Sequence, residues 1–364
     1  MARLRLIKND YTYAELSTSL SPALEKSLEE RQAASTLVVN FFSADSITIG
    51  VLEDPEKSLD LDFCGEQGIV VRRRQNPGGA IFANKGSVMN CLYLDMDQPW
   101  VPFKSIREAF PFFLERMAQV ISEQFGLNAR YRPVNDIEVE GRKLVATSAR
   151  LENRVLTLRS VINVCPVDRT VISRAIIARP EKFQDKQQKN GGSRFTCLQE
   201  EVGRTTRPEE LVDLATKTMK RVFDPELAIE IGTLSPLEEQ YFHEYQVQFS
   251  SDKWFYANSE RIRFAHADPT ARKVEAFHKA PAGLMGVVLL VLQGRIHDLI
   301  LLADFHPSPY SVIGQMEDAL RGQPLELDAI MAQVDPVYNA PGVEIPGTGL
   351  SDFSALFERA LKQL

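Results

Sequence analysis

Three consecutive arginines before a Pro-Gly-Gly turn are the residues of this chain best suited to binding an anion. An apolar strand leads into Arg72, Arg73 and Arg74, and Pro77-Gly78-Gly79 follows. Because side chains alternate along a strand, we expect Arg72 and Arg74 on one face and Arg73 on the other. The glycines let a ligand approach backbone N–H groups closely. The pattern indicates an anionic small-molecule site, and these residues alone leave open a solvated, arginine-rich hairpin end.

A second candidate lies in residues 135–144, where Asn135-Asp136 opens an alternating strand and a turn at Gly141 leads to Lys143. A lysine that enters a strand just after a turn can present its ammonium group to a ligand. When this segment is read alone, Lys143 is more typical of an ordinary surface lysine than of a site residue. Its role therefore depends on what else the fold brings to it.

Several common kinds of site find no support in the sequence. Residues 79–85 lack the second glycine of a P-loop, and no G-x-G-x-x-G run occurs. All five histidines lie in the last third of the chain, which nearly excludes a Ser or Cys triad confined to the first 242 residues. We read these histidines, His306 included, as surface or packing residues. They are His243, His266, His278, His297 and His306.

The composition limits the classes of protein to which this chain can belong. The net charge of −7 argues against broad electrostatic binding to nucleic acid or anionic membranes. The first residues lack the apolar core of a signal peptide, and the longest apolar run, 284–292, is too short to span a bilayer. Four scattered cysteines are typical of reduced thiols. We therefore expect a cytoplasmic protein without nucleic-acid or membrane partners and without a metal site of its own.

The elements that must position these residues include both helices and strands. Strands come in pairs more often than they alternate with helices, which predicts an α+β fold rather than a doubly wound one. We expect two domains, 1–240 and 241–364. Residues 179–193 are polar and read as a mobile surface loop. The expected helices are 14–34, 106–125, 169–178, 208–223, 236–245, 310–320, 327–334 and 352–364. The expected strands are 35–42, 46–51, 69–74, 81–95, 135–146, 155–164, 283–292 and 296–304.

Taken in order, these segments resemble the lipoate–protein ligase family. Its R-R-x-S/T-G-G-G-A-V loop is similar to residues 73–81, and its N-D-I/L-x-x-x-G-x-K-I/V run is similar to residues 135–144. The polar loop and residues 193–198 resemble the family's adenylate-binding loop and its tail. Residues 252–254, 294–298 and 303–305 resemble the accessory domain of bacterial ligases. The resemblance thus covers essentially the whole chain.

Some positions depart from the family pattern. Pro77 replaces a loop glycine, which removes one N–H donor and fixes φ. Residues 83–87 replace H-D-x-G-N and therefore lack its histidine and carboxylate. After the lysine, S-G-S/N/T-A becomes Val145-Ala146-Thr147-Ser148. The H-H-G-T start of a later strand is replaced around residues 155–160, without histidine.

The resemblance implies a biotin/lipoate ligase-like catalytic domain, with mixed sheets flanked by helices, and a small α+β C-terminal accessory domain. The implied enzyme uses ATP, with Mg²⁺ bound to its phosphates, to activate lipoate or a related medium-chain acid as an acyl-adenylate. It then transfers the acyl group to a lysine of a lipoyl-carrier protein, either a glycine-cleavage H-like protein or the lipoyl domain of a 2-oxoacid dehydrogenase. Two alternatives stay open: an ATP-independent octanoyl or lipoyl transferase, and a non-catalytic paralogue that binds lipoate or a carrier.

The same resemblance implies which residues form the site. Lys143 falls at the catalytic lysine, where an ammonium group would stabilise charge in both half-reactions. We expect a narrow apolar slot for the acyl chain near Val70, Ile81 and Val161. The implied substrate- and ATP-binding residues are Arg73, Arg74, Asn76, Gly78, Gly79, Ala80, Asn135, Asp136, Thr147 and Ser148.

Overall fold

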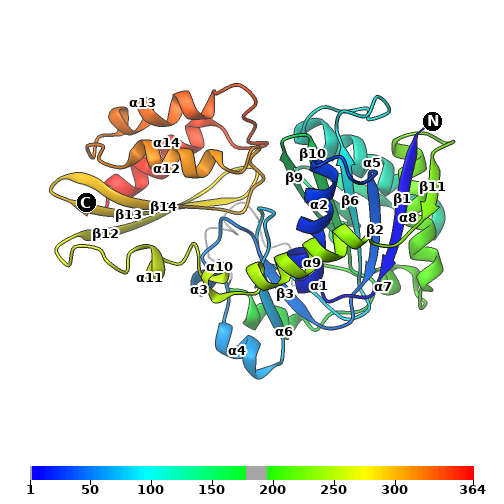
Figure 1. Cartoon of the computed structure of the whole chain (residues 1–364). Coiled ribbons are helices and arrows are strands. Elements are labelled where there is room, and N and C mark those ends of the chain that lie inside the picture. The colour runs from blue at the N-terminus through cyan, green and yellow to red at the C-terminus, as the bar shows by residue number, and fades with distance from the viewer. Residues whose placement is uncertain (1, 178–194) are drawn as a thin grey trace.

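The largest element of the fold is an eight-stranded mixed sheet. The computed structural model describes residues 2–177 and 195–364. The strand order of the sheet is β11-β1-β2-β6-β10-β9-β8-β7, so the first and last strands of the domain lie together at one edge (Figure 1). Its strands are β1 (Arg3–Asn9), β2 (Thr36–Phe41), β6 (Val88–Asp95), β7 (Ala129–Arg132), β8 (Asp136–Val139), β9 (Arg142–Glu152), β10 (Val155–Ile162) and β11 (Ala228–Ile231).

Helices cover both faces of this sheet and enclose two apolar cores. One face packs against α5 (Ile106–Phe125) and α8 (Pro208–Val222). The other packs against α1 (Tyr13–Glu15), the π-helical turn η1 (Leu16–Leu20) and α2 (Ser21–Glu29), with α9 (Pro236–Phe249) lying across them (Figure 1). Alternate residues of each central strand therefore point into different cores.

A second, three-stranded sheet carries the arginine run. Its order is β4-β3-β5, with β3 parallel to β4 and antiparallel to β5. Its small apolar core includes Ile47, Ile49, Phe63 and Ala175. The strands are β3 (Ser46–Ile49), β4 (Val70–Arg73) and β5 (Ile81–Ala83), and the helices beside them are α3 (Pro55–Ser58), α4 (Leu61–Glu66) and α6 (Arg169–Ala175).

The C-terminal part forms a separate α+β layer pair. A three-stranded antiparallel sheet packs against three helices around its own apolar core (Figure 1). The strands are β12 (Arg272–Lys279), β13 (Leu284–Leu292) and β14 (Arg295–Ala303), and the helices are α12 (Val312–Leu320), α13 (Leu327–Tyr338) and α14 (Leu350–Leu361). The short helices α7 (Leu198–Val202), α10 (Asp252–Phe255) and α11 (Glu260–Arg263) complete the described elements.

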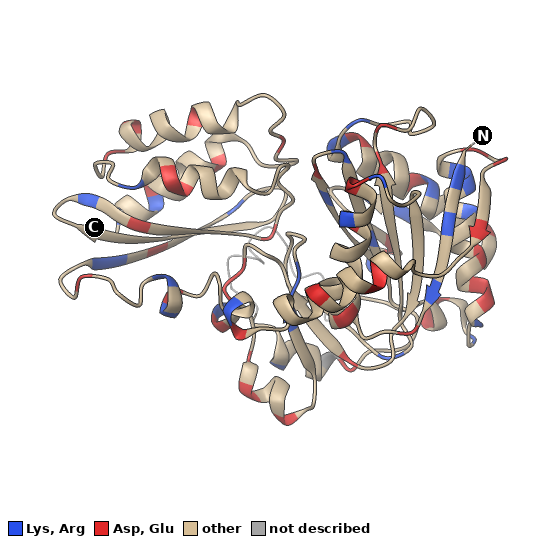
Figure 2. Cartoon of the chain, in the orientation of Figure 1, with Lys and Arg blue, Asp and Glu red and all other residues tan. Residues whose placement is uncertain are grey.

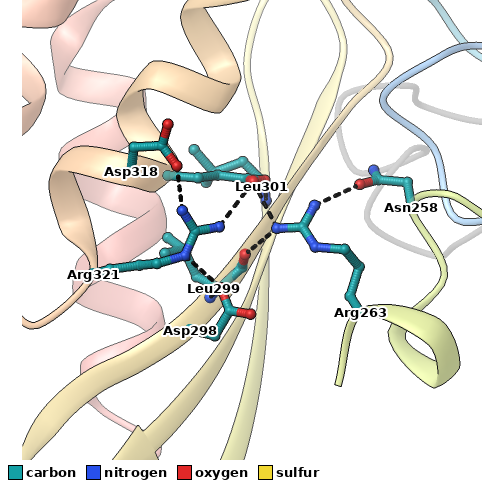
Figure 3. A network of polar contacts seen from close by, with 8 residues as sticks. Asn258, Arg263, Asp298, Leu299, Leu301, Asp318 and Arg321 are labelled. Carbon is teal, nitrogen blue, oxygen red and sulfur yellow. Dashed lines mark hydrogen bonds and ion pairs between the residues drawn. The ribbon is translucent and has the colours of Figure 1, made fainter. Parts of the chain in front are cut away.

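A polar network fixes the segment before β12 to this C-terminal unit (Figure 3). Arg263 of α11 donates to the Leu299 carbonyl at 3.1 Å and pairs with Glu317 of α12 at 2.9 Å. Arg321 pairs with Asp298 of β14 at 2.8 Å. Glu317 is 6% exposed, and burial raises the pKa of its carboxyl. The network is structural, because its members join α11, α12 and β14 to one another.

The α+β class predicted from the sequence is confirmed, and α5 has the predicted bounds. The first helical segment ends at Glu29 rather than at residue 34, and residues 81–95 form two strands, β5 and β6. Strands β1, β7, β11 and β12 were not predicted. Three of these are edge strands, whose partly polar sequences lack a clear apolar run. The predicted domain boundary at 240 stays a prediction, and it falls inside α9.

Charged residues of both signs are interspersed over the two halves of the molecule in Figure 2. This view shows no large region of a single sign, in keeping with the modest net charge of −7. Among the described residues, no helix combines the length and apolar content needed to cross a bilayer. The polar stretch predicted as a mobile loop, 179–193, lies outside the described residues.

Candidate active site

The glycine turn packs against a second glycine at the end of β3. Gly78 has φ +97°, a left-handed backbone conformation that favours glycine. A Cβ atom on Gly50 would lie 2.0 Å from the Gly78 carbonyl oxygen, so the two backbone segments touch directly. A Cβ on Gly78 would itself meet Arg74 and His306. The turn therefore requires glycine at both positions.

Arg74 holds this turn through its carbonyls, and Arg73 holds the segment that follows β3. Arg74 Nη2 donates to the carbonyls of Pro77 and Gly79, both at 2.9 Å, and its Nη1 donates to the Thr48 carbonyl at 2.9 Å. Arg73 donates to the carbonyl of Val51 at 2.7 Å. Burial lowers the pKa of Arg73 to about 10, so the guanidinium stays charged at neutral pH. Arg74 therefore fixes the glycine turn, and Arg73 fixes the segment beside it.

The expected alternation of the three arginines is wrong in detail. Arg73 and Arg74 are both buried, at 1% and 0% exposed, while Arg72 is half-buried. Strand β4 ends at Arg73, so Arg74 lies beyond the strand and outside its alternation. Because most of their N–H groups already meet backbone carbonyls, direct contact of these arginines with a phosphate stays a prediction.

The other predicted loop residues occupy different surroundings. The Asn76 carbonyl accepts from Val51 N–H at 3.2 Å, while its fully buried side-chain amide has no hydrogen-bond partner among the described residues. Gly79 contributes the carbonyl that Arg74 holds. Ala80 lines a cavity of about 50 Å³ between the two domains, together with Asp54 and Asp304.

Lys143 is paired with the aspartate of its own motif. Its Nζ lies 2.6 Å from Asp136 Oδ2, which joins the starts of β9 and β8. The lysine side chain is 24% exposed, and its ammonium lies 5.9 Å from the centre of the Phe195 ring. The Lys143 carbonyl also accepts from Thr196 N–H at 3.0 Å. The Lys143–Asp136 pair therefore places a positive charge at the starts of β8 and β9, where solvent can reach it.

Asn135 connects this lysine segment to the glycine turn through a residue of the C-terminal domain. Its Nδ2 donates to the Thr147 carbonyl at 2.6 Å and lies 3.3 Å from His306 Nε2. His306 also packs on the ring of Phe110, with centroids 5.6 Å apart. Asn135, His306 and Gly78 thus form one continuous line of contacts from Asp136 to the loop.

His306 is buried at 6% exposure, and sequence reasoning missed its place beside the predicted site. Burial first, and then the nearby Arg74 cation, lower the pKa of His306 to about 4, so the ring is neutral at pH 7. It does pack, as predicted, but against residues of the other domain. No local signal could have shown this, because its partner Asn135 lies 171 residues earlier in the chain.

Thr147 and Ser148 point to opposite faces of the large sheet. Thr147 Oγ1 lies 3.1 Å from Ser160 Oγ, on the face that packs against α5. Ser148 pairs in register with Arg159, whose side chain reaches Glu25 of α2 on the other face. Adjacent strand residues must separate in this way. The structure therefore brings Ser148, and not Thr147, to the core beneath α2.

The predicted apolar slot shares its face of β10 with polar side chains. Val161 lies in the core beneath α2, and Ile81 packs against that core, while Val70 lies in the smaller sheet. Two residues from Val161, Arg159 is fully buried and 3.3 Å from Glu25 Oε1. Glu25 also accepts from Arg150 at 2.6 Å and Thr157 at 2.7 Å. Sequence reasoning missed Glu25 and Arg159 as candidates.

A family profile described as the Lipoyl protein ligase A/B catalytic domain matches residues 19–220, more than half of the chain. Residues 19–220 include the glycine turn, Lys143 and the central strands β2, β6, β9 and β10.

This chain belongs to the lipoate–protein ligase family.

Two named lipoate–protein ligases are similar to this ligase-family chain over most of its length. Lipoate-protein ligase LplJ of Bacillus subtilis is 22% identical over 294 residues, covering 80% of this chain and 82% of the relative. Lipoate–protein ligase 2 of Staphylococcus aureus is 21% identical over 305 residues, covering 82% and 84%. Because both alignments extend beyond the catalytic part, the similarity includes the C-terminal domain.

Solved structures show the same fold. P. falciparum LipL1, solved in complex with lipoate, superposes with a TM-score of 0.71 at 13% identity and covers 99% of this chain and 100% of that one. A lipoate-protein ligase A bound with ATP superposes with a TM-score of 0.56 at 17% identity, covering 70% and 99%. The predicted biotin/lipoate ligase-like fold is therefore confirmed.

Proposed function

We propose that this ligase-family protein activates lipoate or a related medium-chain acid with ATP and transfers the acyl group to a lysine of a lipoyl-carrier protein. The observation that carries the proposal is the line of contacts from Lys143 and Asp136 through Asn135 and His306 to Gly78. A fixed cation and a turn with a close backbone approach lie at its two ends. These are the groups that an acyl-adenylate requires.

The proposed reaction has two steps. In the first, a carboxylate oxygen of the acid attacks the α-phosphorus of ATP, and pyrophosphate leaves. In the second, the neutral amine of the carrier lysine attacks the acyl carbonyl carbon, AMP leaves, and the amine loses a proton. Negative charge develops on oxygen in both transition states, and we assign its stabilisation to the Lys143 ammonium. Asp136, 2.6 Å away, positions that ammonium.

ATP would bring Mg²⁺ with it. Magnesium usually keeps several waters and binds through substrate phosphates together with one or two carboxylates. Among residues 2–177 and 195–364, no group of three or more His, Cys, Asp or Glu side chains is placed to hold a metal ion. The nucleotide phosphates would therefore supply most of the contacts to the ion.

A lipoyl domain is the kind of carrier that this proposal implies. One relative, a bipartite lipoate protein ligase from Thermoplasma acidophilum, was solved in a study together with its E2 lipoyl domain. That fold match has a TM-score of 0.57 and covers 70% of this chain. An H-like protein of the glycine-cleavage type is the other carrier to be tested.

The decisive experiment mixes purified protein, Mg-ATP and each carrier with lipoate, octanoate or octanedioate, and follows AMP release and carrier mass. Carrier modification accompanied by AMP is the expected result. Transfer from an acylated carrier without ATP would instead identify a transferase, and binding without either product would identify a non-catalytic paralogue.

Lys143→Ala tests the assigned role within this assay. We expect activity to fall about 10²–10³-fold, the loss typical of one transition-state donor. The matched control is Lys217→Ala, which removes an exposed lysine that is also paired with an aspartate, Asp213, at 2.6 Å. Equal activity in the two variants would contradict the assignment.

A further inference from the structure

Four buried side chains on one side of the large sheet have hydrogen-bond donors without partners. We call Tyr13, Arg74, Ser148 and Arg159 the donor cluster. Each is at most 2% exposed. Tyr13 Oη, Arg74 Nε, Ser148 Oγ and both Nε and Nη1 of Arg159 have no hydrogen-bond partner among the residues the structure describes.

The four side chains lie together. Ser148 and Arg159 are register partners on β9 and β10 and point to the same face. Tyr13 lies in the same apolar cluster as Val161 of β10, and α1, which carries Tyr13, packs against β4, directly before Arg74. Burial lowers the pKa of Arg74, and the nearby Arg159 cation lowers it further, because the two positive charges repel each other. The sulfur of Cys91, opposite Arg159 on β6, is only a weak acceptor. The cluster therefore presents several donors to one buried region.

Glu25 is a carboxylate acceptor in this region, and it already accepts hydrogen bonds from three side chains. Glu25 accepts from Arg150 and Thr157 as well as from Arg159, and its contact with Arg159 is the longest of the three, at 3.3 Å. Leaving a buried donor unsatisfied is destabilising, and more so for a charged group. An oxygen acceptor on a ligand would remove that destabilisation.

The donor cluster adjoins both the glycine turn and the apolar core beneath α2. Arg74 braces the turn with its Nη2, so its free Nε lies just behind the loop. Val161 is two residues from Arg159 on the same face of β10, within an apolar cluster that includes Leu20 and Leu24. A ligand that passes the turn would meet apolar side chains and donors together.

The reacting carboxyl does not belong at the donor cluster. Lys143, to which we assign the activation chemistry, lies five residues before Ser148 on β9. At about 3.3 Å per residue the two backbone positions lie roughly 17 Å apart along the strand. The Lys143 ammonium pairs with Asp136, whose register partner on β9 is Ala146, so the distance left for the acid is shorter than this. A group bound by Ser148 and Arg159 is therefore a different part of the acid.

We propose that the donor cluster is the binding subsite for the far end of the acid, and that this end carries an oxygen acceptor, most favourably a second carboxylate. This inference rests on the proposed function. It makes a polar-ended medium-chain acid a better substrate than octanoate or lipoate, because only the former satisfies the buried donors.

The test measures pyrophosphate exchange and carrier acylation with octanoate, 8-hydroxyoctanoate, octanedioate and lipoate. In the wild-type protein we expect kcat/KM to be at least about tenfold higher for octanedioate than for octanoate. Arg159→Met should lower the octanedioate value by about 10–100-fold, the loss of a charged hydrogen bond, and leave octanoate within about threefold. Equal use of the two acids by the wild type would overturn the proposal.

Removal of Arg159 alone leaves Glu25 with one fewer cation and could prevent folding. The double variant Glu25→Gln/Arg159→Met removes both charges and is tested in parallel. The matched control is Arg5→Met on β1, which loses an arginine paired with another buried carboxylate, Glu238 of α9. A folded double variant that loses activity equally with every acid would show that the cluster binds the reacting carboxyl, which contradicts the proposal.

Calorimetry without ATP separates this inference from the proposed ligase activity. Octanedioate should bind the wild type and the Arg5→Met control, and bind the double variant at least about tenfold more weakly. If octanedioate binds in this pattern but no acid is turned over, the subsite proposal is supported and the proposed ligase activity is contradicted. Binding of octanedioate that does not depend on Arg159, or no binding of any acid, would reject the subsite.

Discussion

At the residue scale, the contact of Gly50 with the Gly78 carbonyl sets the shape of the turn. The space between the two backbones admits hydrogen only, since a Cβ on Gly50 would lie 2.0 Å from that oxygen. The carbonyls of Pro77 and Gly79 are held on their inner side by Arg74. A shift at Gly50 would therefore move the whole turn that we assign to ligand binding.

Gly50→Ala should destabilise the protein by about 1–3 kcal/mol, the usual cost of overpacking, and reduce adenylation at least tenfold. The measurements are denaturant unfolding and pyrophosphate exchange. Gly65→Ala is the matched control, because a Cβ there meets no atom within 4 Å and the residue lies in helix α4. We expect that control to be neutral or slightly stabilising. Wild-type stability and activity in Gly50→Ala would refute this account of the turn.

At the scale of elements, α10 docks on the end of β4 through two reciprocal contacts. Arg73 Nε donates to the Phe255 carbonyl at 2.9 Å, and Trp254 Nε1 donates to the Arg73 carbonyl at 2.8 Å. Arg73 also bonds to Val51, so one side chain ties β4, the segment after β3 and α10 together. A buried guanidinium that donates to the carbonyls of Phe255, Val51 and Gly50 is well suited to join segments far apart in sequence.

Arg73→Met should therefore lower the free energy of unfolding by about 2–4 kcal/mol, because buried carbonyls lose a charged donor. Chemical denaturation followed by tryptophan fluorescence measures the change, since Trp254 lies at the junction. Arg72→Met is the control: Arg72 is half-buried and its one side-chain hydrogen bond among the described residues goes to its neighbour Val71. Equal losses in the two variants would show that Arg73 has no special part in docking α10.

For the whole molecule, His306 makes the contact between the two domains sensitive to acid. The ring is buried against Phe110, Asn135 and Gly78, and the charged groups that act on it are Arg74 and Asp304. Its pKa is about 4 in the folded protein and 6.5 when exposed. Below pH 6.5 the unfolded chain therefore binds a proton that the folded chain does not.

Stability from neutral His306 is complete above pH 6.5 and is lost as the pH falls from 6.5 towards 4, with a slope of at most about 1.4 kcal/mol per pH unit. His306→Gln should remove this part of the acid sensitivity. The measurement is the difference between variant and wild-type unfolding curves across that range, which cancels the titration of carboxylates common to both. His297→Gln, at an exposed position of the same domain, should keep the wild-type slope. An unchanged slope in His306→Gln would contradict the mechanism.

Much of the fold could be predicted because its signals are local. Helix α5 has apolar residues at helical spacing, and Gly126 ends it with φ +70°, so its bounds follow from the sequence. Edge strands such as β7 and β11 are short and partly exposed, and they depend on a neighbour for their hydrogen bonds. Their existence is decided by that pairing rather than by their own side chains.

The sequence by itself determined the α+β class, the glycine turn and the motif around Lys143, because periodicity, φ preference and residue type act over a few positions. Only the tertiary structure decided what those residues meet. Arg74 turns to the loop carbonyls, His306 reaches Asn135, and Arg159 faces Glu25 with donors left over. These partners lie up to 171 residues apart, and they meet because buried polar groups must find partners wherever the packed elements place them.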